Sequence, residues 1–474
     1  MSVPHEIRQG KIMALAIVGV ALTVFAGRSR EMYVTPPGGY GTNNPPFTNW
    51  ADAATNIQWA VSAATNGEVV WVTNGEYVLT NQIVITNGIT LQSVNGRNYT
   101  FLNGNRDATS NRCVLLSNVS AIVRGFCISN GGNSTLSGGG VYCYNGILSD
   151  CLVTLNLATN GGGIRLVNGT ITNCTVITNQ STGRSYGSEG GGGIYAKGGS
   201  GYILNCDIIS NYAYQCGGIM VSANGIYLIR GCHVLYNVAY MDCGGIFLSV
   251  ASGGTDKTHV RECTISQNAA RNNEGGGAYL WLSSGSHEAL SFSNCLFSGN
   301  TARFGGGGCI MYGGLLCNCL FNSNIVTDAN NMGGGIRTVR TGAIIRNCTI
   351  AGNSSQNTAN GLMVTNAVQI VNSLVYSNIV YDLSTNGIFT NCCLQSTNNI
   401  AGTGNITNNP LFADFSGGNY RLQNNSPCIN AGVNQDWMRT ANDLGGYQRI
   451  DHFSGVVDMG CYEYLPQGMM FSVP

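Results

Sequence analysis

The feature that most constrains this chain is a repeated phrase. Two or more glycines and an aliphatic residue are followed by Asn-Cys, and another Asn comes five residues after the Cys. Three clear copies have their glycines and aliphatic residue at 161–164, 191–194 and 333–336, their Asn-Cys pairs at 173–174, 205–206 and 347–348, and their later Asn at 179, 211 and 353. Repeats of about 20 to 50 residues are typical of solenoids, in which each unit packs on its neighbours. The repeat therefore predicts a stacked array of coils.

The repeat units indicate short β-strands. In 343–350, alternation places Ile345, Cys348 and Ile350 inward and Arg346 and Thr349 outward, around a bend at the Asn between them. One coil then supplies the crossover between parallel strands, and each coil rises by about 4.8 Å. We expect residues 111–400 to form this array, with about ten or more coils.

The 19 cysteines divide into two groups. Ten occupy one repeat position, with Ser373 in a gap of the series, and a small apolar thiol suits a crowded interior. We expect these to form a buried column: Cys127, Cys151, Cys174, Cys206, Cys232, Cys263, Cys295, Cys319, Cys348 and Cys392. The disulfide candidates lie off this column. Cys216 and Cys243 are at equivalent positions one repeat apart, and Cys428 and Cys461 lie near the C-terminus.

The Asn five residues after the column Cys recurs nine times. Stacked in register, its side-chain amides can hydrogen-bond along the rod and satisfy backbone groups at a tight turn. We expect an asparagine ladder of Asn156, Asn179, Asn211, Asn237, Asn268, Asn300, Asn324, Asn353 and Asn378.

The glycine runs have a structural interpretation. A phosphate-binding loop requires a following helix, and β-branched strand residues follow here instead. A calcium β-roll requires an Asp ligand, which is missing after these glycines. We expect turns in which only glycine permits the backbone angles or the close approach of neighbouring coils.

The N-terminus resembles a secretory signal. Arg8 and Lys11 precede an apolar run from residue 12 to residue 26, which is too short for a good membrane span. We expect a signal peptide of residues 1–26 with cleavage before Gly27, and an uncleaved anchor is the alternative. No later segment is long and apolar enough to span a membrane. The expected location is the extracellular medium or the outer cell surface.

Residues 27–110 differ from the array and are expected to form an N-terminal cap with the first coils. Residues 51–64 have helical periodicity, and strands are predicted at 32–34, 69–72, 77–85 and 89–93. A helix over the first strands would protect the open end from edge pairing. Residues 401–465 follow the last repeat as a C-terminal cap module, and 466–474 form a tail. No sorting motif or hydrophobic tail follows Tyr464, which leaves release from the cell open beside surface attachment.

The charge composition limits the partners. The chain has 474 residues, with 22 basic and 22 acidic side chains and a net charge of zero. Binding to nucleic acid favours a basic face, so we expect no nucleic-acid partner. Asn, Ser, Thr and Gly replace Lys and Glu, which predicts an uncharged surface rich in hydrogen-bonding groups.

These motifs resemble a known group of proteins. The Gly-Gly-Ile and Asn repeats are similar to those of right-handed parallel β-helix proteins of the pectate-lyase-like superfamily, and similar phrases occur in polymorphic outer-membrane autotransporter adhesins. The N-terminal Ile-Gln-Trp-Ala-Val at 57–61 and Gly-Glu-Tyr at 75–77 resemble the same class. The segments 409–412 and 458–463 resemble the C-terminal part of choice-of-anchor β-helix surface proteins. The resemblance implies an all-β fold, a right-handed parallel β-helix with an N-terminal capping helix and a C-terminal cap. The superfamily includes lyases, hydrolases, epimerases, adhesins and phage spikes, so the fold implies no single activity.

Two chemistries are known for such rods. A lyase requires a basic residue near a calcium ion held by acids, and a hydrolase requires two or three facing carboxyl groups. Register predicts one charged patch formed by Asp207, Arg230, His233 and Arg261, with Glu262 beside it. A second acidic group precedes the glycine turns: Glu189, Asp242 and Glu274. Outward charges usually keep a surface solvated, so both remain weak catalytic candidates.

The histidines lack the spacing of a metal site. We expect no metal and no cofactor, with calcium relevant only to a lyase.

The leading hypothesis is a secreted or cell-surface rod that binds a glycan or another surface. Tyr195, Tyr279 and Trp281 are candidates for stacking on sugar rings, with core packing as the alternative for each. A polysaccharide lyase or glycoside hydrolase acting on extracellular polysaccharide is the second hypothesis, and a structural fibre subunit is the third. The C-terminal cap disfavours open stacking of chains, so we expect a monomer.

Overall fold

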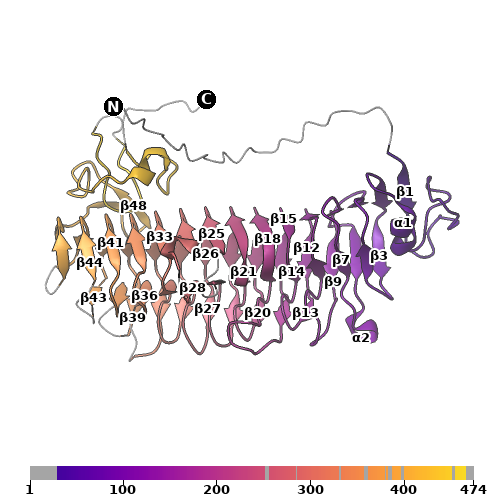
Figure 1. The fold of residues 1–474 in the computed structure, drawn as a ribbon, viewed down its shortest axis with the longest axis horizontal. Coiled ribbons are helices and arrows are strands. Elements are labelled where there is room, and N and C mark those ends of the chain that lie inside the picture. Colours follow the sequence, from indigo (N-terminus) through magenta and orange to yellow (C-terminus); the bar gives the residue numbers. More distant parts are fainter. Residues whose placement is uncertain are drawn as a thin grey trace, which may run out of the picture.

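The computed structural model describes residues 29–250, 256–283, 285–329, 333–356, 361–378, 380–382, 387–396, 400–450 and 454–465. The chain winds into a long rod of parallel strands, and the C-terminal module lies on one side at the far end from β1 (Figure 1). Three parallel sheets of 25, 13 and 8 strands form the rod, and this is the right-handed parallel β-helix that the sequence predicts.

The 25-stranded sheet consists of two columns. β18 (Ile194–Leu204) and β21 (Ile219–Arg230) are long enough to run through both. The first column contains β1 (Glu31–Val34), β2 (Val69–Val72), β5 (Thr90–Ser93), β8 (Ile122–Arg124), β11 (Ile147–Ser149), β15 (Gly169–Thr172), β25 (Lys257–Arg261), β29 (Leu290–Ser293), β33 (Leu315–Cys317), β37 (Ile344–Arg346), β41 (Gln369–Val371), β44 (Ile388–Thr390) and β46 (Ala401–Thr403). The second column contains β4 (Ile83–Ile85), β7 (Val114–Leu116), β10 (Val141–Cys143), β14 (Ile164–Leu166), β24 (Ile246–Val250), β28 (Ala278–Leu282), β32 (Cys309–Tyr312), β36 (Ile336–Thr338), β40 (Leu362–Val364) and β43 (Val380–Asp382).

The other two sheets complete each coil. The 13-stranded sheet contains β3 (Gly75–Val78), β6 (Thr100–Asn103), β9 (Cys127–Ser129), β12 (Leu152–Thr154), β16 (Thr175–Ile177), β19 (Asp207–Ile209), β22 (His233–Leu235), β26 (Thr264–Ser266), β30 (Leu296–Ser298), β34 (Leu320–Asn322), β38 (Thr349–Ala351), β42 (Leu374–Tyr376) and β45 (Cys393–Leu394). The 8-stranded sheet contains β13 (Leu157–Ala158), β17 (Gln180–Ser181), β20 (Tyr212–Ala213), β23 (Val238–Ala239), β27 (Ala269–Ala270), β31 (Thr301–Ala302), β35 (Ile325–Val326) and β39 (Ser354–Ser355).

The interior of the rod follows the repeat. The ladder Asn side chains are buried, and the amide of each donates to the next: Asn179 Nδ2 lies 3.0 Å from Asn211 Oδ1, and Asn211 Nδ2 lies 3.0 Å from Asn237 Oδ1. The glycines are required by close approach, because a Cβ on Gly193 would lie 3.0 Å from the Asn211 amide and from the carbonyl oxygen of Gly218 on the next coil. The asparagine ladder is therefore confirmed.

All 19 cysteines are buried free thiols. Nine of the ten predicted column cysteines lie in the central core, and burial raises the pKa of Cys392 to about 12. The prediction is wrong for Cys127, which pairs with Leu152 on the next coil, so that Phe126 occupies the column position beside Cys151. The sequence proposes Cys216, Cys243, Cys428 and Cys461 as disulfide candidates, but each is a free thiol here. Cys428 interacts with Cys393 on the last coil of the 13-stranded sheet, rather than with Cys461.

The residue before each of the nine column cysteines from Cys151 to Cys392 has a left-handed backbone, with φ of 53° at Asn173 and 50° at Asn347. Asn tolerates this conformation better than most residues, which explains the repeated Asn-Cys pair. These residues form an outer corner between the first column and the 13-stranded sheet: Asp150, Asn173, Asn205, Gly231, Glu262, Asn294, Asn318, Asn347, Asn372 and Asn391. The corner is a second asparagine-rich column, on the outside of the rod.

The N-terminal end is closed by α1 (Ile57–Ala63), which buries Ile57, Ala60 and Val61 against the core. The helix is shorter than the predicted 51–64. Asn56 has extended backbone and its side chain accepts a hydrogen bond from the amide of Gln58, so the helix begins after Asn56. A second short helix, α2 (Arg106–Thr109), and a 3₁₀ turn, η1 (His287–Ala289), lie in loops. No helix in the described residues is long and apolar enough to cross a membrane.

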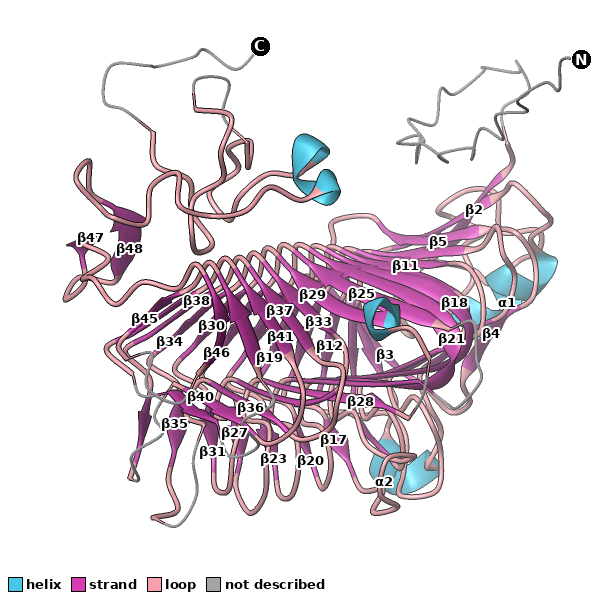
Figure 2. Ribbon diagram, turned by 60° about the vertical axis from the view of Figure 1, so that its left-hand side comes forward, coloured by secondary structure: helices cyan, strands magenta, loops and turns pink. Residues whose placement is uncertain are grey.

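The C-terminal module consists of the hairpin β47 (Phe412–Asp414) and β48 (Asn419–Leu422), the 3₁₀ turn η2 (Asp436–Thr440) and connecting loops (Figure 2). It covers the outer side of the 13-stranded sheet at Leu320 and Leu374, and the corner asparagines bind its backbone. We call this covered surface the module face. The rod pairing continues through β46, just past the predicted boundary at 400, and the predicted signal peptide and tail lie outside the described residues.

Candidate functional site

The candidate site lies on the outer side of the second column, which we call the aromatic face. Five outward side chains stand in register on β18, β21, β24, β28 and β32: Tyr195, Met220, Phe247, Tyr279 and Ile310. Alternation along the strands directs them away from the core, yet they form a buried cluster of their own. Burial of outward side chains distinguishes this part of the rod from an ordinary solvated outer face.

The cover is the segment 182–190, which precedes β18. The Tyr195 hydroxyl donates to the carbonyl oxygen of Ser188 at 2.5 Å, and the Tyr186 and Tyr279 hydroxyls are 3.0 Å apart. Gly187 N donates to Gln215 Oε1 at 2.8 Å and closes the segment against the next coil. Tyr195 and Tyr279 are only 3% and 1% exposed, so the prediction that they stack on sugar rings is not supported by their positions.

Trp281 is half-buried, as is Tyr312 beside it on the next coil. Their ring centroids are 4.8 Å apart at an interplanar angle of 36°, and Tyr186 meets Trp281 edge-on at 6.4 Å. The Arg340 guanidinium lies over both rings, 4.7 Å from the Trp281 centroid and 5.5 Å from that of Tyr312. We call Tyr186, Trp281 and Tyr312 the aromatic surface.

Two of the predicted acidic residues adjoin this surface. Glu274 forms an ion pair with Arg337 and accepts a hydrogen bond from the Tyr312 hydroxyl at 3.4 Å. Asp242, one coil earlier and 1% exposed, accepts the amide of Glu274 through Oδ1 at 3.4 Å, and its Oδ2 has no hydrogen-bond partner. The structure thus brings the sequence-predicted Asp242, Glu274, Tyr279 and Trp281 into one site.

Burial dominates the acid–base properties of this site. It raises the pKa of Asp242 to about 7; the hydrogen bond from the Glu274 amide opposes this shift, and the charge of the Glu274 carboxylate adds to it. Burial also raises the pKa of Glu274, although Arg337 opposes the shift. Burial, together with the charge of Asp242, raises the pKa of Tyr186 to about 12. The site therefore contains one carboxyl that titrates near neutrality and one paired with a cation, the kind of difference that separates an acid from a base.

Glu189, the third residue of the predicted acidic group, has a local role. Its Oε2 accepts the amides of Arg184 and Ser185 at 2.9 and 3.0 Å, and these hydrogen bonds lower the pKa of Glu189. The carboxylate stabilises the turn of the covering segment and is separate from the pair at Asp242 and Glu274.

The predicted charged patch divides into two surface pairs. Asp207 Oδ1 is 2.9 Å from His233 Nδ1, and Arg230 Nε is 2.8 Å from Glu262 Oε2, with all four side chains about half exposed. Exposed pairs of this kind contribute little to stability. Within the described part of the chain Arg261 forms no ion pair, and it lines a groove beside the module instead. These residues give no sign of a catalytic centre.

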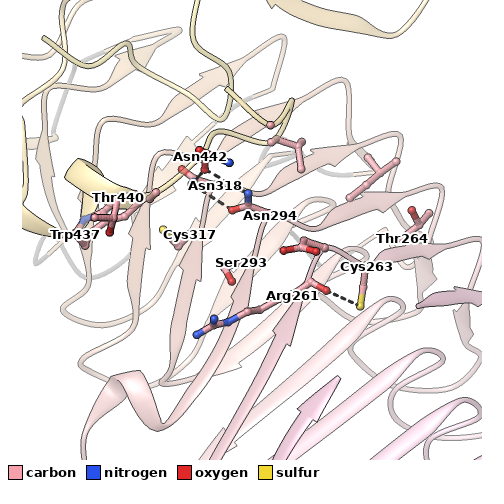
Figure 3. A pocket seen from close by; sticks show the side chains of 15 residues that line it. Arg261, Cys263, Thr264, Ser293, Asn294, Cys317, Asn318, Trp437, Thr440 and Asn442 are labelled. Carbon is pink, nitrogen blue, oxygen red and sulfur yellow. Dashed lines mark hydrogen bonds between the residues drawn. The ribbon is translucent and has the colours of Figure 1, made fainter. Parts of the chain in front are cut away.

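The groove, of about 820 Å³, lies between the rod and the C-terminal module (Figure 3). Arg261, Asn294 and Asn318 line its rod side, and Trp437 and Asn442 its module side. Asn318 Nδ2 donates to the Asn442 carbonyl oxygen at 2.9 Å, so the corner asparagines hold the two sides together.

Several residues of these sites were missed from the sequence: Tyr186, Tyr312, Arg337, Arg340 and Trp437. Register along the second column could have indicated Tyr312, because it follows Trp281 one coil later. Register could also have indicated Arg337, which follows Ile310 one coil later on β36. Tyr186, Arg340 and Trp437 lie outside the strands, in segments that leave no periodic signal. No group of three or more potential metal-ligating side chains occurs among the described residues.

No family model matches the chain, and no curated protein matches it in sequence. Solved structures of similar shape include pectate lyase Pel9A (13% identity, 92% of this chain and 96% of that one, TM-score 0.39), a rhamnogalacturonan lyase (12%, 93% and 97%, 0.36) and the A-module of the mannuronan C-5 epimerase AlgE4 of Azotobacter vinelandii (13%, 74% and 91%, 0.33). At these identities and TM-scores, the similarities carry no inference about activity.

Proposed function

We propose that this protein is an extracellular or cell-surface rod that binds glycans through the aromatic surface. The observation that carries the proposal is the half-exposed pair of Trp281 and Tyr312, with centroids 4.8 Å apart, beside Glu274, Arg337 and Arg340. The apolar face of a sugar ring stacks on aromatic rings, and its hydroxyl groups bind charged planar groups at the rim.

Arg340 has a defined role in this proposal. Its exposed guanidinium occupies the space over Trp281 and Tyr312, where a sugar ring would stack. A ligand would displace Arg340 to the side, where its donors would bind sugar hydroxyls. Arg337 and Glu274 are paired and would remain in place, so the rim is largely preorganised.

The proposal is tested by titrating the purified chain with neutral and uronate-containing polysaccharides and following retention in affinity electrophoresis. Trp281→Ala is expected to weaken binding by about tenfold, because stacking of one ring contributes about 1 kcal/mol or more. Trp59→Ala is the matched control, since Trp59 is 49% exposed at the N-terminal end of the rod. Equal retention of the wild type and the Trp281 variant would reject this site.

A second function is favoured by the carboxyl pair. Asp242 and Glu274 lie on adjacent coils with pKa values raised by burial, as a glycoside hydrolase requires of its acid. The near-complete burial of Asp242 keeps it from direct contact with a substrate, so binding remains the leading proposal. Release of reducing ends that disappears in Glu274→Gln and persists in Glu189→Gln would establish the enzyme instead.

Secretion and a monomeric state belong to the same proposal, because a glycan-binding surface of this kind serves outside the cell. Fractionation of cells that express the tagged chain, with detection in the medium and at the surface, tests the location. Sedimentation equilibrium tests the monomer.

A further inference from the structure

The groove beside the C-terminal module is chemically distinct from the aromatic face. It lies on another side of the rod, where β25, β29 and β33 end and the segment 437–446 overhangs them (Figure 3). Its volume of about 820 Å³ is within the range of small-molecule sites, which is roughly 300–1,000 Å³. The groove is large enough for a short oligomeric ligand.

Two polar groups in this groove have no hydrogen-bond or ion-pair partner among the residues that the structure describes. Asn318 is 1% exposed, and its Oδ1 accepts no hydrogen bond although Nδ2 donates to the Asn442 carbonyl oxygen. An unsatisfied buried acceptor costs free energy, so such an atom marks a place where a donor is expected. Arg261 is exposed at the rim, while its neighbour Glu262 is already paired with Arg230.

Trp437 supplies an aromatic wall. Its indole Nε1 donates to Gln435 Oε1 at 2.6 Å, and the Arg346 guanidinium lies 5.2 Å from the ring centroid. These two contacts hold the half-buried ring in place at the end of the groove. A fixed aromatic ring is suited to stack on a ligand, because little side-chain freedom is lost on binding.

We infer that this groove is a second saccharide-binding site, which takes a short oligosaccharide with free hydroxyl groups. The sugar ring stacks on Trp437, a hydroxyl donates to Asn318 Oδ1, and Arg261 and Glu262 bind hydroxyls at the rim. The rod then binds two saccharide segments on two faces, and the module contributes one wall of a site besides covering the rod. This site is independent of the aromatic surface, so either can fail alone.

Two sites on one rigid rod have a measurable consequence. A polysaccharide long enough to reach both would bind more tightly than a trisaccharide, because the second contact becomes intramolecular. A trisaccharide can occupy each site only separately. The number of trisaccharides bound per chain therefore distinguishes one site from two.

The test is calorimetric titration of the full chain with the trisaccharides cellotriose, maltotriose, xylotriose and mannotriose. At least one is expected to bind with two equivalents per chain. Trp437→Ala is expected to remove one equivalent and Trp281→Ala the other. Because the Trp437 change can disturb the module, Arg261→Ala tests the groove from the rod side and is expected to weaken the same equivalent by about fivefold.

Arg439→Gln is the matched control. Arg439 lies two residues after Trp437 on η2, is exposed, and pairs only with Asp436 at 3.7 Å. The Arg439→Gln chain is expected to bind trisaccharides as the wild type does. Two retained equivalents in a folded Trp437→Ala chain, or unchanged affinity of both equivalents in a folded Arg261→Ala chain, would overturn the inference.

The outcomes separate the two sites. Loss of all binding in Trp281→Ala overturns the groove and leaves the proposed function standing. Loss of all binding in Trp437→Ala supports the groove and overturns the aromatic surface. Absence of heat with all four trisaccharides overturns both.

Discussion

The aromatic face and the module face are both outer surfaces of one rod, yet each is covered by a different kind of contact. On the aromatic face, the outward residues Tyr195 and Tyr279 are covered by the segment 182–190 and by apolar neighbours one coil away. On the module face, corner asparagines bind backbone groups of a segment far along the chain: Asn372 exchanges two hydrogen bonds with Val433, at 2.9 and 2.8 Å.

On the outside of a solenoid, residues at the same repeat position can therefore have different environments. Inside the rod, each position meets the same position of the next coil, so identity in the repeat predicts contact. Outside, the same corner position is exposed at Asn173 and buried at Asn372. The segment that packs over a corner position, and not the repeat, therefore determines the exposure and the hydrogen bonds of its side chain.

The largest expected effect concerns the interior of the module. Arg449 is fully buried, and its Nη2 lies 3.0 Å from Glu463 Oε1 and 3.1 Å from the Asp458 carbonyl oxygen. Arg449→Met should destabilise the module by about 3–5 kcal/mol, because Glu463, Asp443 and Asp458 remain buried without their cation. Denaturant unfolding should then show an early transition in Trp437 fluorescence while the far-UV signal of the rod persists.

The control for this prediction is Arg439→Met, whose exposed pair with Asp436 should contribute less than about 0.5 kcal/mol. Simultaneous loss of the rod and module signals in the Arg449 variant would show that the covered face is continuous with the core. The module and the rod would then unfold as one cooperative unit, and the proposed separate unfolding of the module would be wrong.

The next effect concerns the aromatic face and depends on pH. The folded-state pKa of Asp242 is raised to about 7, above its ordinary value, so the folded state binds more protons than the unfolded state between about pH 4 and 7. Stability should therefore fall as pH rises through this window. Asp242→Asn should abolish this pH-dependent loss of stability, which reaches about 4 kcal/mol at pH 8 when the pKa moves from 3.8 to about 7.

Urea unfolding midpoints at pH 4, 6 and 8 measure this effect, with Asp107→Asn as control because its side chain is fully exposed. Glu274, which is paired with Arg337, titrates at the same face and interacts with the Asp242 carboxylate, so the difference between the two proteins includes this interaction. Parallel pH curves for wild type and Asp242→Asn would contradict a raised pKa of the buried Asp242 carboxyl.

The fold was predictable because stacking turns sequence periodicity into contact. The spacing of Asn179 and Asn211 implied an amide-to-amide bond, and the structure has it at 3.0 Å. The same argument placed Asp207 beside His233 and Asp242 beside Glu274. The column positions from Cys151 to Cys392 needed no information beyond the repeat, whereas Cys127 lies one residue past the column position, which Phe126 occupies.

The rest of the site was not predictable, because it depends on irregular segments. The sequence left both surface stacking and core packing open for Tyr279, because the segment that covers it carries no repeat. The groove joins Asn318 to Asn442, 124 residues later, and no periodicity links them. The alternation of a strand predicts which side chains leave the core, but it does not predict what lies over them.

The smallest expected effect concerns two positions of the same corner column, Asn173 on its open part and Asn372 under the module. Asn173 and Asn372 have φ values of 53° and 50°, so Gly can replace either without backbone strain. Asn173→Gly, on the open part, should change stability by only a few tenths of a kcal/mol, whereas Asn372→Gly should loosen the module by about 1–2 kcal/mol through its lost hydrogen bonds. Hydrogen exchange of the Val433 amide, which donates to Asn372 Oδ1, measures the loosening directly. Faster exchange in Asn372→Gly alone would show that the cover gives this position its role, and equal exchange in both variants would mean that the module is held by its apolar contacts with Leu320 and Leu374 instead.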